Sequence, residues 1–358
     1  MSEISGQNGP ADPERFAGRH SAGGRPRGRR PARPRRGWRI ALVSLASFVV
    51  LLGVAAVGGY AYVNQLAGSI QRIPVKFAKL DGATQPAGAM TMLMTGGTTG
   101  PISAGTPGST GMIMLLHINA GDSGGGVVSI PPEALVQVPG HGQTEINNAL
   151  AYGGASLLVR TVEQLTNVPI NHYVRINFTN IANLLNAIGG VDVSLPKKTE
   201  AEVSVTLPKE TVTKEYTFHA GVNHLNGITA VYYARQTSLT EEERVLRQQT
   251  VIRAIMDKIS SQHLLTNPVT MYRVMKALTT MLALDSNFTS PQVMKMAGDI
   301  DHLSGAGGTF VTAPTYNASG DVHLNSSVSN ELWTAIRHDS IAAFAAKYPA
   351  TVTPGAPN

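Results

Sequence analysis

The chain has 358 residues, of which 42% are hydrophobic and 15% are charged, with a formal net charge of +6 and no cysteine. The lack of cysteine excludes disulfides, a thiol nucleophile and metal sites built on thiolates. Residues 1–39 contain ten arginines and three acidic residues, a net charge of +7 that leaves −1 for the rest of the chain. The basic character therefore belongs to the N-terminal segment and not to the folded domain.

Two N-terminal segments predict a membrane anchor. Residues 1–39 are rich in Arg, Pro and Gly, so we expect a disordered tail. Residues 40–63 carry no charge. As a helix they would reach about 36 Å, enough for a bilayer core of about 30 Å. Trp38, Tyr60 and Tyr62 flank this stretch as interfacial aromatic residues do. The alternative is a cleaved signal peptide, whose apolar core is usually shorter.

The charge asymmetry predicts the orientation of this anchor. Arg-rich segments stay in the cytoplasm, so we expect a single-pass cell-membrane protein whose main domain is extracytoplasmic. An Arg-rich tail also suits nucleic acid. Directly beside a membrane span, it is better explained by topology and by anionic lipid headgroups. We therefore expect a membrane partner and no nucleic-acid partner.

Beyond the span, apolar strands alternate with helices. Residues 64–89 are expected to connect the span to a domain at 90–347, and residues 348–358 to form a disordered tail. The strands are expected at 90–94, 112–118, 127–130, 172–178, 191–195, 230–234 and 309–312, and a polar excursion at 196–224 is expected to hold a hairpin. The helices are expected at 147–167, 181–188, from 241 onward, and at 268–284, 291–303 and 330–339. Such alternation indicates an α/β domain.

The segment 225–249 carries the strongest functional signal. Thr240 and Glu243 have the spacing of a capping box, and the helix that follows has Ile252, Ile255, Met256 and Ile259 in one arc. Glu241, Arg244 and Gln248 lie in the same arc, Arg247 lies at its edge, and Arg235 ends the preceding apolar run. Buried guanidinium groups are costly unless they are paired or face a ligand. Planar bidentate donors of this kind suit phosphate or pyrophosphate.

Structural interpretations compete with several of these signals. The charges of 225–249 also suit a buried ion-pair network, with Glu241 paired to Arg244. His117 lies within an apolar strand, and we expect a core residue with its hydrogen bonds satisfied. Met271, Val274, Leu278 and Met281 recur at helical spacing and suit the core or one wall of a lipid tunnel. The histidines show no spacing typical of a zinc site.

Several segments resemble the LytR-CpsA-Psr family of cell-envelope proteins. In chain order they read SIPPE (129–133), INNALAYGG (146–154), HYVRINF (172–178), IGGVDV (188–193), HLNGITAVYYAR (224–235) and EEERVLRQQ (241–249). The order of these segments over about residues 90–260 makes the resemblance specific. A basic tail, one membrane span and an external domain are also the layout of this family.

The resemblance implies a three-layer α/β/α sandwich with a central mixed sheet, preceded by one transmembrane helix. It further implies a phosphotransferase that binds a glycopolymer linked to polyprenyl (pyro)phosphate and transfers it to peptidoglycan with the help of Mg²⁺. Arg235, Arg244, Arg247 and Gln248 would bind phosphate. Glu133 and Glu241 would be the catalytic carboxylates, and Glu133 would also be a metal ligand.

The chain departs from the family at several site positions. Ser109 and Gly111 stand where an Arg and an Asp are usual, Pro132 replaces another Arg, and Thr237 replaces a third. Glu133 and Glu241 replace aspartates. The loss of ligands puts the Mg²⁺ site in question. The alternative function is therefore a non-catalytic paralogue that binds lipid or glycan, as a scaffold or a regulator of other family members.

Overall fold

The structure is a computed structural model that describes residues 65–77, 80, 82, 84–97, 111–122, 124–177, 180–206, 211–234, 241–261, 267–299 and 308–352. All of these belong to one compact unit, Ala56–Asn358. The predicted tail at 1–39 and the predicted span at 40–63 lie outside the described residues. Among the helices of the described residues, none has the length and apolar character needed to cross a bilayer.

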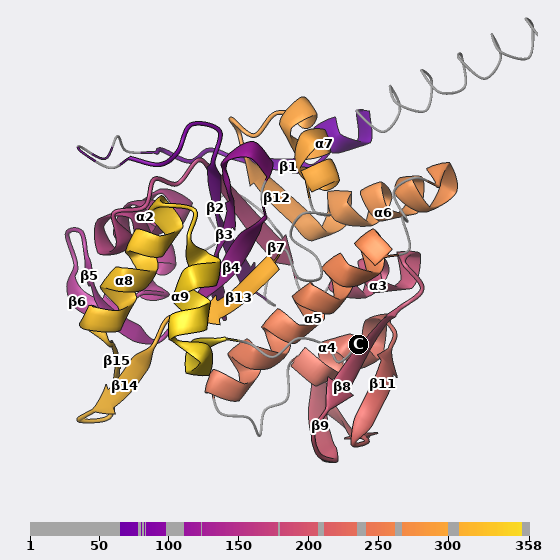
Figure 1. Ribbon diagram of the computed structural model, residues 1–358. Helices are drawn as coiled ribbons and strands as arrows, with labels where there is room; N and C mark the ends of the chain where they lie inside the picture. The colour runs from indigo at the N-terminus through magenta and orange to yellow at the C-terminus, as the bar shows by residue number, and fades with distance from the viewer. Residues whose placement is uncertain are drawn as a thin grey trace, which may run out of the picture. The chain divides into compact units, whose positions relative to one another are not determined.

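A mixed sheet of seven strands forms the centre of this unit (Figure 1). Its strands are, in spatial order, β1 (Gln71–Ile73), β12 (Leu282–Asp285), β7 (His172–Asn177), β2 (Met90–Gly97), β3 (Met112–Ile118), β4 (Gly125–Ile130) and β13 (Gly308–Thr312). Strands β7, β2, β4 and β13 run in one direction, while β12 and β3 run against their neighbours in this group. The carboxyl ends of four strands therefore meet at one edge of the sheet.

The two faces of the sheet are covered by different helices (Figure 1). Met92 and Met94 of β2 pack in one core with helices α3 (Ile181–Ala187), α4 (Gly227–Ala234), α5 (Glu241–Ser261), α6 (Pro268–Met281) and α7 (Ser290–Asp299). Leu93 packs in the other core with α2 (Asn148–Thr166), α8 (Ser326–Arg337) and α9 (Ile341–Lys347). Side chains alternate between faces along a strand, so one strand serves both cores. This is the α/β/α arrangement with a central mixed sheet that the sequence predicts.

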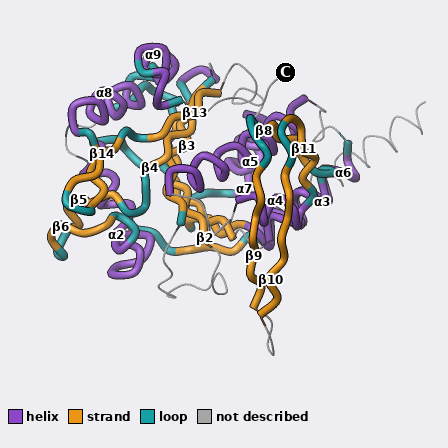
Figure 2. The backbone as a smooth tube through the Cα atoms, turned by 90° about the horizontal axis from the view of Figure 1, so that it is seen from below, coloured by secondary structure: helices purple, strands orange, loops and turns teal. Residues whose placement is uncertain are grey.

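Smaller, separate sheets accompany the central one. A sheet of four strands consists of β14 (Thr315–Ala318), β15 (Asp321–Leu324), β5 (Ala134–Val138) and β6 (Gly142–Glu145). β8 (Val191–Leu195) pairs with β11 (Gly221–Leu225). β9 (Thr199–Thr206) and β10 (Thr211–Phe218) form an antiparallel pair that projects from the body beside α4 (Figure 2). The hairpin expected within 196–224 is thus confirmed.

The strand predicted at 230–234 is wrong, because these residues belong to helix α4. Asn226 caps this helix: its Oδ1 accepts from the backbone N of Ile228 and of Thr229, each at 3.1 Å. Gly227 lies so close to α3 that an added Cβ would be 2.4 Å from the Ala182 carbonyl oxygen. The outward positions of this helix, Ile228 and Val231, are apolar. The run therefore has no helical stripe of polar residues, and its period does not separate strand from helix.

Other boundaries differ in smaller ways. The helix expected at 268–284 ends at Met281, and the following residues form β12 in the central sheet. Part of the expected connector forms β1, which joins the same sheet. Within 348–358, residues 349–351 form a 3₁₀ turn, and Val352 bridges to Val311. Gly189 and Gly190, which follow the helix expected at 181–188, have φ of 78° and 81°, the left-handed region that favours glycine.

Candidate functional site

The described site residues lie near the carboxyl ends of strands of the central sheet. Glu133 follows β4 in a turn that is fixed on both sides. The Ala134 backbone N donates to the Pro131 carbonyl at 3.1 Å, and the Asn147 backbone N donates to the Pro132 carbonyl at 3.0 Å. Glu133 itself is half-buried. The edge of an α/β sheet formed by strand carboxyl ends is where such folds usually bind ligands.

Gln249 holds helix α5 over this edge. Its side chain is fully buried. Its Nε2 donates to Ser129 Oγ on β4 at 2.5 Å and to Thr312 Oγ1 on β13 at 3.2 Å. Sequence reasoning missed this residue. The available signal was its spacing, because Gln249 precedes Ile252 by three positions and Met256 by seven, on the face that packs against the sheet.

Arg247 is a buried cation near the N-terminal end of α5. Its side chain is 9% exposed, and its Nη1 donates to the Tyr233 carbonyl at 3.3 Å. Its guanidinium carbon lies 4.9 Å from the centre of the Tyr233 ring, a cation–π contact. Burial lowers the pKa of Arg247, while Tyr233 and Glu243 act in the opposite direction. An arginine remains protonated under such shifts, so the prediction of a charge on the buried side of α5 is confirmed.

Gln248 is also buried, at 7% exposure. Its Oε1 has no hydrogen-bond partner among the residues that the structure describes. An unsatisfied buried polar group costs about 1–3 kcal/mol, so such groups in folded proteins call for an explanation. A ligand that contacts Gln248 would supply one. The amide would accept from a ligand hydroxyl or, rotated by half a turn, donate to a phosphate oxygen.

Three predicted site residues lack described side chains. Arg235 lies outside the described residues altogether. Glu241 and Arg244 lie in the first turn of α5, but only their backbone is described. Of the six predicted site residues, Glu133 follows β4, and Arg247 and Gln248 directly precede Gln249 on α5. The roles of all six stay predictions.

The described residues do not by themselves fit a Mg²⁺ site. No group of three or more His, Asp or Glu side chains able to hold a metal ion is found in the described ranges. Glu133, the predicted ligand, supplies a single carboxylate. Mg²⁺ requires near-octahedral oxygen ligands, often one or two carboxylates with waters and substrate phosphates. The reaction proposed for this chain therefore assigns no step to a metal, and the Mg²⁺ requirement stays a prediction.

His117 is a core residue with satisfied hydrogen bonds, as predicted. It is fully buried, with Nε2 at 2.8 Å from Asp339 Oδ1 and Nδ1 at 2.9 Å from Thr91 Oγ1. The carboxylate only accepts, so Nε2 carries the proton and Nδ1 accepts from the threonine hydroxyl. Burial lowers the pKa of His117, although Asp339 acts in the opposite direction. Because these contacts explain His117, it is not a site residue.

The helix α6 residues that suit either the core or a lipid tunnel pack in the core beside the sheet. Val274 and Met281 are buried, and Met271 and Leu278 pack against the same cluster while partly buried. The structure therefore places all four in the hydrophobic core.

Comparison with known proteins identifies relatives of this chain. The model of the LytR_cpsA_psr family matches residues 63–337. The polyisoprenyl-teichoic acid–peptidoglycan teichoic acid transferase TagU of Enterococcus faecalis is 32% identical over 180 residues, which cover 49% of this chain and 55% of that protein. The transferase of the same description, TagT, of Bacillus subtilis is 33% identical over 149 residues, which cover 41% and 45%. The chain thus spans about half the length of these curated relatives.

Solved structures share the fold. The LytR-Csp2A-Psr enzyme from Actinomyces oris superposes with a TM-score of 0.58 at 17% identity, over 80% of this chain and 99% of that one. TagV of B. subtilis superposes with a TM-score of 0.56 at 19% identity, over 71% and 97%. At these identities the likeness shows the α/β/α fold alone.

Proposed function

Because this chain belongs to the LytR_cpsA_psr family, we propose that it binds a glycopolymer linked to polyprenyl (pyro)phosphate and transfers it to peptidoglycan. Relatives that match about half of it are named as transferases of polyisoprenyl-linked teichoic acid to peptidoglycan. The structural observation that carries the proposal is the neighbouring pair Arg247 and Gln248. Both are buried at the sheet edge, one as a permanent cation and the other as an amide whose oxygen lacks a partner among the described residues.

Arg247 would bind the pyrophosphate. A charge interaction is stronger away from bulk water, and the cation–π contact with Tyr233 already fixes the guanidinium. Arg235, which precedes α5 in the sequence, and Arg244, in the first turn of α5, would add further positive charge. Gln248 would orient the phosphate or the attacking hydroxyl. Such a site stabilises charge on the transferred phosphoryl group, the main requirement of this chemistry.

The reaction would be the displacement of polyprenyl phosphate. A hydroxyl of the acceptor attacks the phosphorus next to the glycopolymer, and a new oxygen–phosphorus bond forms. The bond from this phosphorus to the bridging oxygen breaks, and its electron pair leaves with the polyprenyl monophosphate. Glu241 or Glu133 would take the proton of the hydroxyl as general base.

The cellular setting follows from the N-terminal segments. We propose that residues 40–63 anchor the protein in the membrane and that the domain lies outside the cytoplasm, where lipid-linked polymer meets the wall. The non-catalytic alternative rests on Ser109, Gly111 and Pro132, which replace an Arg, an Asp and an Arg that are usual in the family. The transferase names of the relatives do not favour it.

The test compares Arg247→Lys with the native full-length protein in detergent micelles. Lysine keeps the charge but loses the planar bidentate fork. We expect the rate of polyprenyl phosphate release from a polyprenyl-pyrophosphate-linked saccharide to fall about 100-fold, as when one charge-stabilising donor is removed. Arg273→Lys, at an exposed position of α6, is the matched control and should keep the native rate. Equal rates in both variants, with unfolding temperatures unchanged, would exclude Arg247 from the site.

A further inference from the structure

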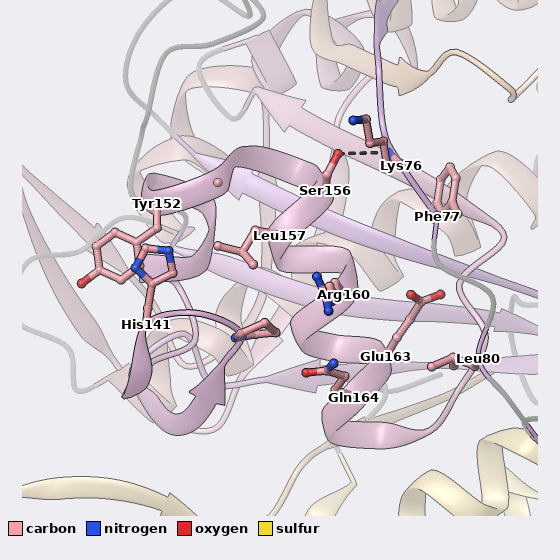
Figure 3. Close-up of a pocket in the computed structure, with 12 residues that line it drawn as sticks. Lys76, Phe77, Leu80, His141, Tyr152, Ser156, Leu157, Arg160, Glu163 and Gln164 are labelled. Carbon is pink, nitrogen blue, oxygen red and sulfur yellow. Dashed lines mark hydrogen bonds between the residues drawn. The ribbon is translucent and has the colours of Figure 1, made fainter.

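A cavity lies away from the sheet edge. It has a volume of about 570 Å³ and is bounded by the turn between β5 and β6, by α2 and by Lys76, Phe77 and Leu80 (Figure 3). Glu133 precedes the five residues of β5, whereas Pro139 and His141 of the cavity follow them. At about 3.3 Å per residue, β5 separates the two places by about 17 Å. The cavity is therefore distinct from the site described above.

Two aromatic rings form one end of the cavity (Figure 3). The rings of His141 and Tyr152 stack with centroids 4.4 Å apart and planes inclined by 17°. Both side chains are exposed, Tyr152 by 50%, which is unusual for a large aromatic residue. Exposed aromatic faces carry partial negative charge. They suit the C–H face of a sugar ring, which is apolar and weakly positive.

Cationic side chains line the same cavity. Arg160 and Lys76 are both exposed, and neither side chain has an acidic partner among the described residues. The carboxylate in the lining belongs to Glu163, whose Oε1 accepts from the Ile170 backbone N at 3.2 Å. The lining thus has one more positive than negative charge. A guanidinium presents a bidentate fork to a carboxylate or a phosphate, so an anionic group on the ligand is favoured.

A break in α2 shapes the cavity. Gly153 and Gly154 depart from helical geometry, and Gly154 has φ 65° and ψ −161°, a region open essentially only to glycine. A Cβ at Gly153 would lie 2.5 Å from the Leu157 side chain, which lines the cavity. The break lies between Tyr152, which stacks on His141, and Arg160. The two glycines lie between the aromatic residue and the cationic residue of α2 that line the cavity. Their fixed backbone geometry indicates a binding site that is formed before its ligand arrives.

We propose that this cavity binds an acidic saccharide. One sugar ring would pack on an outer face of the His141–Tyr152 stack, and its anionic group would contact Arg160, with Lys76 and Gln164 at the rim. A wall glycan with carboxylate groups and a glycopolymer with phosphate groups share this chemistry. The proposal goes beyond the transfer reaction, because binding here does not require that the sheet edge be catalytic.

The test is isothermal titration of the full chain in detergent micelles with three oligosaccharides. They are a tetrasaccharide of alternating N-acetylglucosamine and N-acetylmuramic acid, a maltotetraose with a terminal phosphate, and neutral chitotetraose. We expect an acidic probe to bind at least fivefold more tightly than chitotetraose. A preference for the carboxylate probe indicates the wall glycan, and a preference for the phosphate probe indicates the donor polymer.

Two variants and a control locate the binding. Tyr152→Ala and Arg160→Gln change exposed side chains, and each should weaken binding of the preferred probe at least tenfold. Arg160→Gln should also abolish the preference over chitotetraose. Arg273→Gln, on α6, should bind as the native protein does. No binding of either acidic probe, equal binding of chitotetraose, or affinities unchanged in both cavity variants would overturn the proposal. The native rate of polyprenyl phosphate release in both variants would separate this result from the chemistry at the sheet edge.

Discussion

The side chain of Gln248 is buried, yet its oxygen accepts no hydrogen bond from the described residues. It is 7% exposed, and its Oε1 lacks a partner among the described residues, while Nε2 of the neighbouring Gln249 donates to side chains of β4 and β13. Two adjacent glutamines thus have different roles. Gln249 fixes the helix to the sheet, whereas Gln248 leaves polar capacity for a ligand. An unsatisfied polar group kept at a binding site lowers the free energy of unfolding in favour of function.

Gln248→Met should therefore separate stability from function. Methionine has similar volume and needs no hydrogen bond, so we expect the free energy of unfolding to stay equal or to rise by about 1 kcal/mol. Affinity for polyprenyl pyrophosphate should fall about tenfold, as expected when about 1.4 kcal/mol of hydrogen bonding is lost. Chemical denaturation and lipid titration measure the two effects. The matched change Gln249→Met should instead destabilise the protein, since it leaves Ser129 and Thr312 without their partner. A Gln248→Met protein that is less stable and binds lipid normally would contradict this account.

His117 makes stability depend on pH. Its pKa is lowered in the folded protein from an ordinary value of 6.5, so the unfolded chain takes up the proton first as the pH falls. The stabilisation is complete above about pH 6.5 and is lost as the pH falls toward the lower folded pKa, by up to about 1.4 kcal/mol per pH unit. We expect the free energy of unfolding of His117→Gln to change less between pH 7 and pH 5 than that of the native protein. The exposed His338→Gln should leave the slope unchanged, and equal slopes in all three proteins would refute the assignment.

At the scale of elements, helix α4 depends on its cap. Asn226 Oδ1 accepts from two backbone N–H groups at the start of the helix. Asn226→Ala should lower the free energy of unfolding by about 1 kcal/mol, the usual value of an N-cap. Asn330→Ala, at an exposed position within α8, is the control and should change it by less than about 0.5 kcal/mol. Equal effects in urea denaturation would mean that the cap does not stabilise α4.

Helix α4 also shows the limit of predicting secondary structure from the sequence. Strands β3 and β8 and the start of α5 could be located, because each combines an apolar pattern with a clear boundary signal. Residues 227–234 could not, since their outward-facing residues Ile228 and Val231 are apolar and leave no periodic polar face. The strands β5, β6, β14 and β15 were missed for a related reason. They are short and partly exposed, and the pairing of β15 with β5 joins segments distant in sequence.

The site was predictable in part. Arg247 and Gln248 followed from the helical period, because a polar residue within an apolar arc must be buried. The anchoring of Gln249 to Ser129 and Thr312 joins residues more than 60 positions apart, and no local pattern encodes such a contact. Sheet order brings these residues together, which a single sequence does not specify.

At the scale of the whole molecule, the proposed functions belong to three places. The N-terminal segments would hold the protein at the membrane, the carboxyl edge of the sheet would bind the pyrophosphate, and the cavity beside α2 would bind an acidic saccharide. Because a lipid-linked donor is confined to the bilayer, anchoring the protein there raises the effective concentration of donor at the site. The full-length chain is therefore the form in which transfer should be measured.

The most direct measurement is single-turnover transfer by the full-length protein in liposomes. The liposomes contain a polyprenyl-pyrophosphate-linked saccharide labelled in the sugar, and isolated peptidoglycan is added outside. We predict that label enters the peptidoglycan through a phosphodiester and that one polyprenyl monophosphate appears for each label transferred, about 100-fold more slowly with Arg247→Lys. Binding of the labelled lipid with neither transfer nor release of polyprenyl monophosphate would contradict the account and would identify the protein as a non-catalytic member of its family.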